Sequence, residues 1–221
     1  MKIKAILLSL LCFVGITTAT AQSDVWVWKG GSAVKTEMAD SITFTAPVRV
    51  LALATTEDIG KIVGADGIFY DTKEDAEAAG TTAVAMIAYV GNETDNVFYK
   101  HGLAIALADE SSSSWSTAKS TCDDKYFSLR VARASWMLPS QNQWKVMFKA
   151  NGGNEDSYTG LNSAITTAGG TALQGVYWSS TEIDDFYAWG VALYVSRYGD
   201  YTYWYDLKKM FNRGVRPCLA F

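Results

Sequence analysis

Residues that could perform acid–base or nucleophilic chemistry are scarce in this chain of 221 residues. Its one histidine, His101, excludes any metal centre that needs two imidazole ligands. His101 precedes the apolar run Gly102–Leu107, which predicts a residue at the end of a strand rather than a general base. The sequence also lacks the G-x-S-x-G, P-loop and G-x-G-x-x-G patterns. We therefore expect a protein that is not an enzyme and that needs no cofactor.

Asp184 and Asp185 are the carboxylates whose spacing most invites a functional interpretation. On a strand, adjacent residues point to opposite faces, which is wrong for a paired-carboxylate catalytic site. On a loop, the two side chains could bind calcium through their oxygen atoms. Because no further acidic cluster lies beside them, we predict no metal site.

The most informative stretch is residues 186–205, in which nine of twenty residues are aromatic. Tyrosine dominates and is interleaved with serine, glycine, aspartate and arginine, a composition typical of binding surfaces such as antibody paratopes. Tyr201, Tyr203 and Tyr205 alternate, so on a strand they share one face. If this aromatic strip is exposed, it indicates a binding site. The alternative is ordinary packing of tyrosines with high β-propensity.

Composition narrows the class of protein further. Apolar residues make up 49% of the chain and charged residues 19%, which excludes a wholly disordered chain, collagen and a coiled coil. The net charge is −4, so we expect no nucleic-acid partner, because binding to phosphate backbones needs a basic surface.

The N-terminal residues 1–21 have the pattern of a signal peptide. Lys2 and Lys4 form a basic segment, Ile6–Ile16 is apolar, and Ala19 and Ala21 occupy the small-residue positions of a cleavage site. The alternative is an uncleaved anchor, but the apolar run is short for a membrane-spanning helix. We expect cleavage after Ala21 and a secreted, periplasmic or cell-surface protein.

The remaining chain divides into a small leader and one larger domain. Residues 22–58 read as a β leader and connector, with strands at 25–28 and 41–45 around a turn at 29–32. The domain is expected at 59–221. Its predicted strands are 59–64, 68–70, 83–90, 102–108, 176–181, 188–196, 201–205 and 215–220.

Helix-capping patterns place short helices between these strands. Thr72 with Asp75 and Ser140 with Gln143 are capping boxes, and the serine run 111–114 offers an N-cap for a helix through Cys122. A weaker helix is predicted over 161–173. Short helices followed by a strand-rich second half predict an α+β fold.

Removal of the signal peptide would leave two cysteines, Cys122 and Cys218. In an oxidising compartment an isolated pair most simply forms a disulfide bond. Two buried free thiols are the alternative.

Several segments, in their order along the chain, resemble the C-type-lectin-like domains of exported Bacteroidetes proteins, whose fold is related to that of formylglycine-generating enzymes. The resemblance covers about 59–221 and rests on Ile59–Gly64 with Asp66-Gly67, His101–Leu107, Trp115–Lys119 with Cys122, Trp136–Ser140, Tyr177–Glu182, Ala188-Trp189 and Val215–Phe221. It implies a C-type-lectin-like fold with short helices around small antiparallel sheets.

The chain also departs from the patterns of these relatives. Met137 replaces the usual arginine of a W-R-L-P motif, and the E-P-N and W-N-D motifs of calcium-dependent sugar binders are absent. Cys122 and Cys218 have the placement of the structural bridge of the fold, not that of the reactive pair of formylglycine-generating enzymes. The resemblance thus implies the fold and the disulfide bond without the catalysis.

Several proteins of the resembled group are variable proteins of diversity-generating retroelements, in which adenines near the end of the gene are randomised. Randomised asparagine codons can yield tyrosine, aspartate or serine, but never tryptophan or lysine. Trp178 and Trp189 are expected to be buried framework. The variable positions implied are Tyr194, Ser196, Tyr198, Asp200, Tyr201, Tyr203, Tyr205 and Asn212. Together with Tyr187 of the aromatic stretch, they are the predicted ligand-binding residues.

The function that the sequence favours is therefore recognition of a protein or glycan ligand by an exported protein, through its tyrosine- and tryptophan-rich C-terminal surface. The alternative is a structural or tip subunit of an adhesive cell-surface filament. In that case residues 22–46 would dock on a filament or outer-membrane partner.

Overall fold

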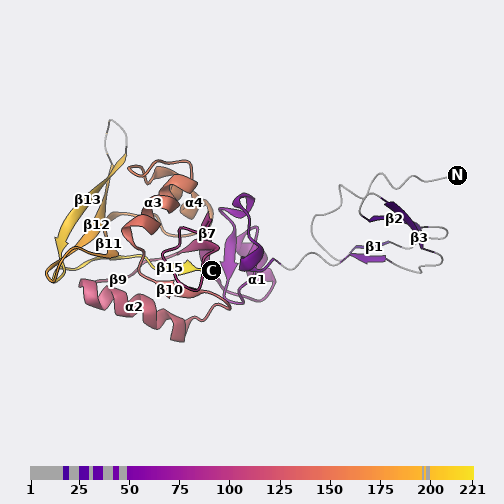
Figure 1. The fold of residues 1–221 in the computed structure, drawn as a ribbon, viewed down its shortest axis with the longest axis horizontal. Coiled ribbons are helices and arrows are strands. Elements are labelled where there is room, and N and C mark those ends of the chain that lie inside the picture. The colour runs from indigo at the N-terminus through magenta and orange to yellow at the C-terminus, as the bar shows by residue number, and fades with distance from the viewer. Residues whose placement is uncertain are drawn as a thin grey trace. The chain divides into compact units, whose positions relative to one another are not determined.

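The computed structural model describes residues 17–19, 25–29, 32–36, 42–44, 49–195, 197 and 200–221. The chain divides into two compact units, Met1–Val48 and Arg49–Phe221, which are considered separately (Figure 1). No helix among the described residues is long and apolar enough to cross a membrane.

The described residues of the first unit form two pairs of short antiparallel strands. β2 (Val25–Lys29) pairs with β3 (Ser32–Thr36), and β1 (Thr17–Ala19) pairs with β4 (Ile42–Phe44). β2 confirms the expected strand at 25–28, and β4 lies within the strand expected at 41–45. β3 was not expected, and it begins at Ser32, the last residue of the predicted turn. β1 lies within the expected signal peptide, so its pairing with β4 requires the uncleaved chain.

The second unit contains a six-stranded antiparallel sheet. Neighbouring strands follow the order β10-β15-β8-β7-β5-β6. These strands are β5 (Ile62–Gly64), β6 (Phe69–Tyr70), β7 (Ala83–Val90), β8 (Gly102–Ala106), β10 (Ser135–Met137) and β15 (Cys218–Ala220). The sheet joins segments from both ends of the unit, because β5 and β6 lie near its start and β15 lies at its end.

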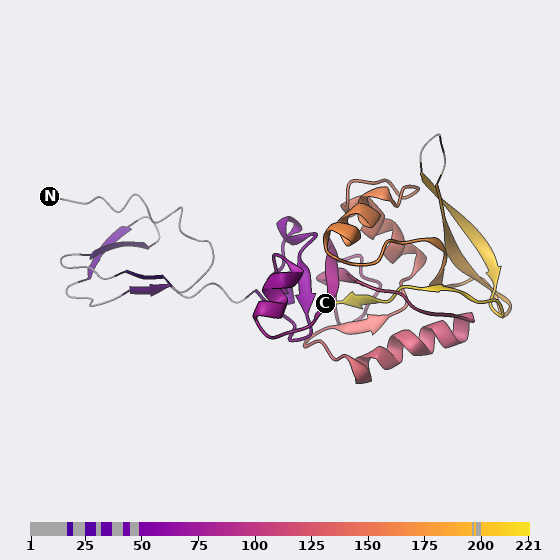
Figure 2. The same cartoon turned by 180° about the vertical axis from the view of Figure 1, so that it is seen from behind.

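A five-stranded sheet forms the other half of this unit, in the order β13-β12-β11-β14-β9 (Figure 2). Its strands are β9 (Glu110–Ser113), β11 (Gly175–Glu182), β12 (Tyr187–Tyr194), β13 (Tyr201–Lys208) and β14 (Arg213–Val215). Only the β11–β14 pair is parallel. Mixed helices and largely antiparallel sheets confirm the expected α+β class.

Four helices accompany the sheets: α1 (Lys73–Ala78), α2 (Trp115–Ser128), α3 (Gln141–Ala150) and α4 (Thr159–Thr167). The two predicted capping boxes are present, at Thr72 with Asp75 and at Ser140 with Gln143. After α1, Gly80 has a φ of +79°, a left-handed conformation that glycine adopts without steric cost.

The serine run is not simply the expected cap. Residues 110–113 form β9, which pairs with β14, and only Ser114 precedes α2. Ser114 makes no side-chain capping bond, although its hydroxyl lies 3.0 Å from that of Thr117. Pairing with a strand about a hundred residues away has therefore overridden the local signal.

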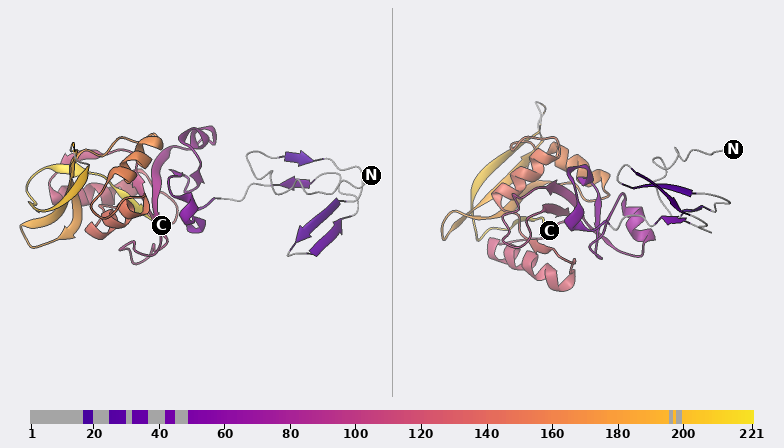
Figure 3. Two further views of the ribbon diagram at one scale, coloured as in Figure 1. Left: turned by 90° about the horizontal axis from the view of Figure 1, so that it is seen from above. Right: turned by 45° about the vertical axis from the view of Figure 1, so that its right-hand side comes forward.

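The second compact unit begins at Arg49 rather than near Ile59. Figure 3 shows the ribbon from two further directions. Leu51 and Ala54 are buried, and the Nε2 atom of His101 lies 2.7 Å from the carbonyl oxygen of Ala54. Residues 49–58, expected to be a connector, are therefore part of the domain. His101 lies just before β8, as its sequence context predicts.

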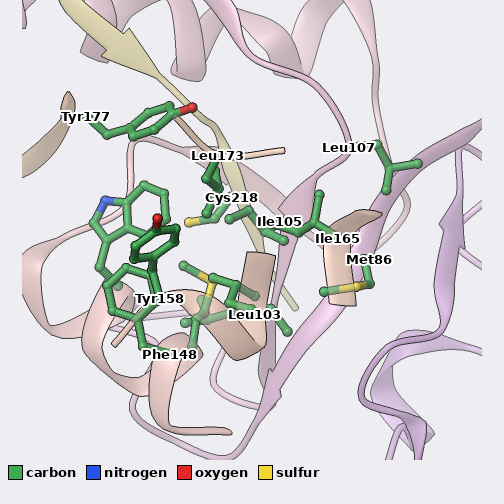
Figure 4. Close-up of a cluster of buried hydrophobic side chains, with 14 of the residues drawn as sticks. Met86, Leu103, Ile105, Leu107, Phe148, Tyr158, Ile165, Leu173, Tyr177 and Cys218 are labelled. Atoms are coloured by element: carbon green, nitrogen blue, oxygen red, sulfur yellow. The ribbon is translucent and has the colours of Figure 1, made fainter. Parts of the chain in front are cut away.

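Two clusters of buried side chains support the five-stranded sheet from opposite faces. The larger contains Trp144 and Phe148 of α3 together with Tyr177 of β11 and core residues of the six-stranded sheet (Figure 4). The smaller contains Trp115 of α2 and Trp178 of β11. Because Tyr177 and Trp178 are adjacent on one strand, they point to opposite faces, so α3 and α2 pack on opposite sides of this sheet.

Candidate functional site

Four tyrosines gather on one face of the β12–β13 hairpin, and we call them the tyrosine cluster: Tyr194, Tyr201, Tyr203 and Tyr205. Tyr201 is 46% exposed, Tyr203 is 54% exposed and Tyr194 is 38% exposed, whereas Tyr205 is half-buried. Of the four, only Tyr203 is more than half exposed. Even so, the strip is a surface feature and not part of the core.

The rings of the tyrosine cluster contact one another in pairs. Tyr194 stacks on Tyr201 with ring centroids 5.2 Å apart and planes 24° apart, and Tyr203 is tilted against Tyr205 at 4.5 Å. The hydroxyls of Tyr194 and Tyr205 share a hydrogen bond. This bond, with some burial and the other nearby tyrosines, raises the pKa of Tyr205 to about 12. Tyr205 is consequently uncharged at neutral pH.

Strand register explains why these four side chains meet. β12 and β13 pair without a shift, which places Tyr194 opposite Tyr201, Ala192 opposite Tyr203 and Gly190 opposite Tyr205. Tyr194 and Tyr205 therefore lie on either side of the Ala192–Tyr203 pair along the hairpin, and their hydroxyls meet. Ala192 is only 1% exposed, as expected if the rings cover it. A larger residue at position 192 would occupy the space of these rings.

The opposite face of the same hairpin is anchored in the core. Val191 and Leu193 belong to the larger buried cluster, and Trp204 packs against it. Thr202 is 6% exposed, and its backbone N–H donates to the carbonyl oxygen of Asp156 at 2.9 Å. The hairpin thus presents tyrosines outward from a backbone that is fixed from behind.

Other predicted site residues do not join the cluster. Tyr187 pairs with Lys208 at the far end of the hairpin, about 23 Å along the strands from Tyr194, and it lies on the opposite face. Asn212 is exposed beyond that same end of β13. The structure therefore does not bring Tyr187 and Asn212 together with the tyrosine cluster, because the hairpin is long and its faces alternate.

The remaining candidates lie near the hairpin turn. Asp200 directly precedes Tyr201, and its carboxylate accepts a hydrogen bond from the buried Tyr158, which helps to raise the pKa of Tyr158 after burial itself. Asp200 therefore links the start of β13 to the segment before α4. Ser196 and Tyr198 lie outside the described residues.

The two framework tryptophans differ in burial. Trp178 is fully buried, and its indole N–H donates to the carbonyl oxygen of Ser113 at 2.9 Å. Trp189, also expected to be buried, is only partly covered. It shares a face with Val191 but lies nearer the 183–186 turn, and the buried cluster includes Val191 and not Trp189.

The structure contains Cys122 and Cys218 as buried free thiols, so the expected disulfide bond is not formed in it. The thiol of Cys218 donates to the side-chain oxygen of Gln143 at 3.8 Å, and the two cysteines belong to different buried clusters. Burial raises the pKa of Cys122 to about 12 and that of Cys218 well above its usual value.

A pocket of about 240 Å³ that the sequence did not indicate lies beside the start of α3. Ser140 donates its hydroxyl to Asp95, and Gln143 donates to the carbonyl oxygen of Thr94. The sulfur atom of Met137 lies 3.1 Å from the side-chain amide nitrogen of Gln143. These polar groups satisfy one another and cap the helix. Asp95, which has a left-handed φ of 47°, was not identified because nothing in the sequence links it to Ser140.

Asp184 has a local structural role. Its carboxylate accepts hydrogen bonds from the backbone N–H groups of Phe186 and Tyr187, both at 2.8 Å, and so shapes the β11–β12 turn. Among the described residues, no three histidine, cysteine or acidic side chains are grouped so that they could hold a metal ion.

Arg216 carries a fully buried charge. In the sequence analysis it appears only within the segment Val215–Phe221, as part of the resemblance. Its side chain donates to Asp109 at 2.5 Å and to two backbone carbonyl oxygens, and Asp109 also accepts from the Tyr177 hydroxyl. One of these carbonyl oxygens belongs to Ala106, so Arg216 links the start of β15 to the end of β8.

No protein-family model matches this chain, and no curated protein matches it.

Proposed function

We propose that this chain is an exported, non-catalytic recognition protein that binds its ligand through the tyrosine cluster on a C-type-lectin-like domain. One observation carries the proposal: four aromatic side chains lie outward on a regular hairpin whose other face is held in the core. Tyrosine offers a large amphipathic contact area at a low entropic cost. A rigid support lowers that cost further.

Diversification of the surface is part of this proposal. Tyr194, Tyr201 and Tyr203 are codon-compatible positions and are exposed, so their replacement changes the surface with little effect on packing. Trp204 is incompatible with such codons, and it packs against the core. At these four positions, the three exposed residues are the codon-compatible ones, and the residue that packs against the core is the incompatible one.

The double variant Tyr201→Ala/Tyr203→Ala tests the proposal. Labelled full-length protein is screened on a glycan array and against phage-displayed random peptides, and the affinity of each hit is then measured. We expect the double variant to lose about 2 kcal/mol or more of binding free energy. Its free energy of unfolding should stay within about 1 kcal/mol of the original protein.

Phe98→Ala is the matched control, because Phe98 is an exposed aromatic residue, at 87%, in a loop outside the sheet. It should leave both affinity and stability unchanged. If every hit binds the double variant as tightly as the original protein, or if the double variant unfolds, the tyrosine cluster is not the recognition site.

A further inference from the structure

β13 is an edge strand. Its eight residues pair with β12 on one side, without a register shift, and no described strand pairs with its other side. Figures 1 and 2 show β13 as the outermost strand of the five-stranded sheet. An edge strand exposes backbone donors and acceptors that another chain can pair with.

One hydrogen bond reveals which backbone groups point outward. The N–H of Thr202 donates to Asp156 and so points away from β12. Because backbone direction alternates along an antiparallel strand, the N–H groups of Trp204, Asp206 and Lys208 point outward as well. In the described part of the chain, no backbone group pairs with the outward N–H and C=O of Trp204 or Asp206. The carbonyl oxygen of Lys208 already accepts from the N–H of Phe211 at 3.1 Å, so Lys208 offers only its N–H to an added strand.

The edge at β6 in the other sheet shows how this chain covers an edge. The N–H of Phe69 donates to the carbonyl oxygen of Arg49 at 2.8 Å, and Val50 forms a β-bridge with Ile68. On β13, the Asp156 loop reaches only Thr202. Of the common devices that prevent pairing at an edge, the segment from Trp204 to Lys208 contains no proline and no bulge, but it carries the exposed charges of Asp206 and Lys208. These charges select among partner strands by their own charge.

We propose that an extended segment of a partner protein binds along Trp204–Lys208 as an added antiparallel strand. This inference rests on the proposed function, because it names the class of ligand for the surface that carries the tyrosine cluster. The backbone ladder would provide affinity, and the side chains on either face of the added strand would provide specificity.

Neighbouring side chains define the chemistry of this segment. Asp206 is exposed on the edge and Asp156 is exposed beside Thr202, so a lysine or arginine opposite Asp206 is favoured. Residues opposite Tyr203 and Tyr205 share the face of the tyrosine cluster. Aromatic and β-branched side chains pair well with tyrosine there. The partner segment is therefore basic at one position and flanked by aromatic or β-branched residues.

The variant Asp206→Pro tests the added strand, because proline removes one outward N–H and leaves the bonds to β12 intact. Phage-displayed random dodecapeptides are selected on the full chain, and enriched peptides are synthesised. We expect Asp206→Pro to weaken their binding roughly tenfold or more, through the lost bond and the ring that replaces it. Asp206→Asn keeps the N–H and should weaken binding by less than about threefold. Circular dichroism and thermal melting verify folding.

Methylation of single backbone nitrogens in the peptide gives a second measurement that does not depend on folding of a variant. Only alternate N–H groups of an added strand face β13. Binding should therefore fall at every second methylated position.

The outcomes separate this inference from the proposed function. If Tyr201→Ala/Tyr203→Ala abolishes binding of the hits while Asp206→Pro and peptide methylation do not, the tyrosine cluster recognises its ligand without an added strand. If no random peptide is enriched but glycan hits depend on the tyrosines, the ligand class is likewise overturned and the site stands. If neither protein variant affects any hit, both proposals fail.

Discussion

Tyr205 illustrates how a residue can be half-buried and still belong to a surface. Its ring lies against Tyr203 and its hydroxyl bonds to Tyr194, so its contacts come largely from other exposed tyrosines. Replacement of one member therefore changes the environment of the others. We expect the effects of substitutions within the cluster on affinity to be non-additive, as is usual for residues in contact.

At the same scale, the two thiols give a prediction about reactivity. Both cysteines are buried and the pKa of each is raised, so the reactive thiolates are scarce at pH 8. In protein that lacks residues 1–21, and with them Cys12, Ellman's reagent should label neither Cys122 nor Cys218 in the folded state and both after denaturation in guanidinium chloride. The neutral thiol of Cys122 contributes stability that is complete below pH 9 and is lost as the pH rises toward 12.

Two other results would each have a clear meaning. If the denatured, unreduced protein shows no reactive thiol, Cys122 and Cys218 are joined after export and the disulfide expectation holds for the mature protein. Rapid labelling of the folded protein would contradict the burial of both residues.

Among the helices, two N-caps form a natural comparison. Ser140 accepts a hydrogen bond from the Gln143 N–H at 3.0 Å at the start of α3, whereas Ser114 makes no capping bond at the start of α2. We expect Ser140→Ala to reduce the free energy of unfolding by about 1 kcal/mol. Ser114→Ala should have a smaller effect. Urea denaturation of both variants measures the difference, and equal losses would contradict the capping assignment.

The elements also show what the sequence could and could not predict. The capping boxes and alternating strands were predicted because their signals lie within a few residues. β9 was missed because its pairing with β14 is long-range, and β10 was missed because three residues carry little pattern. The tyrosine face was predicted from alternation alone. The contribution of Tyr194 depends on the register that places it opposite Tyr201.

At the scale of the whole molecule, the boundary of the domain can be tested by truncation. A chain that begins at Arg49 should melt at the same temperature as the second unit within the full chain, since Arg49–Phe221 is compact by itself. A chain that begins at Ile59 loses the buried Leu51 and Ala54. We expect that loss to cost about 2–5 kcal/mol, as for removal of a buried leucine side chain.

Calorimetry of the two truncated chains measures this effect. If they melt at the same temperature, residues 49–58 contribute nothing to the stability of the core. The interpretation of these residues as a connector, made from the sequence, would then be correct.

The two-sided hairpin has a consequence for how this gene can change over time. Along β13, Tyr201 and Tyr203 face outward, whereas Thr202 and Trp204 face the core. Mutational tolerance should therefore rise and fall with a period of two, high at 201 and 203 and low at 202 and 204. Variants of this gene could therefore carry many different binding surfaces without a loss of stability, because the side chains at the alternate positions pack against the core.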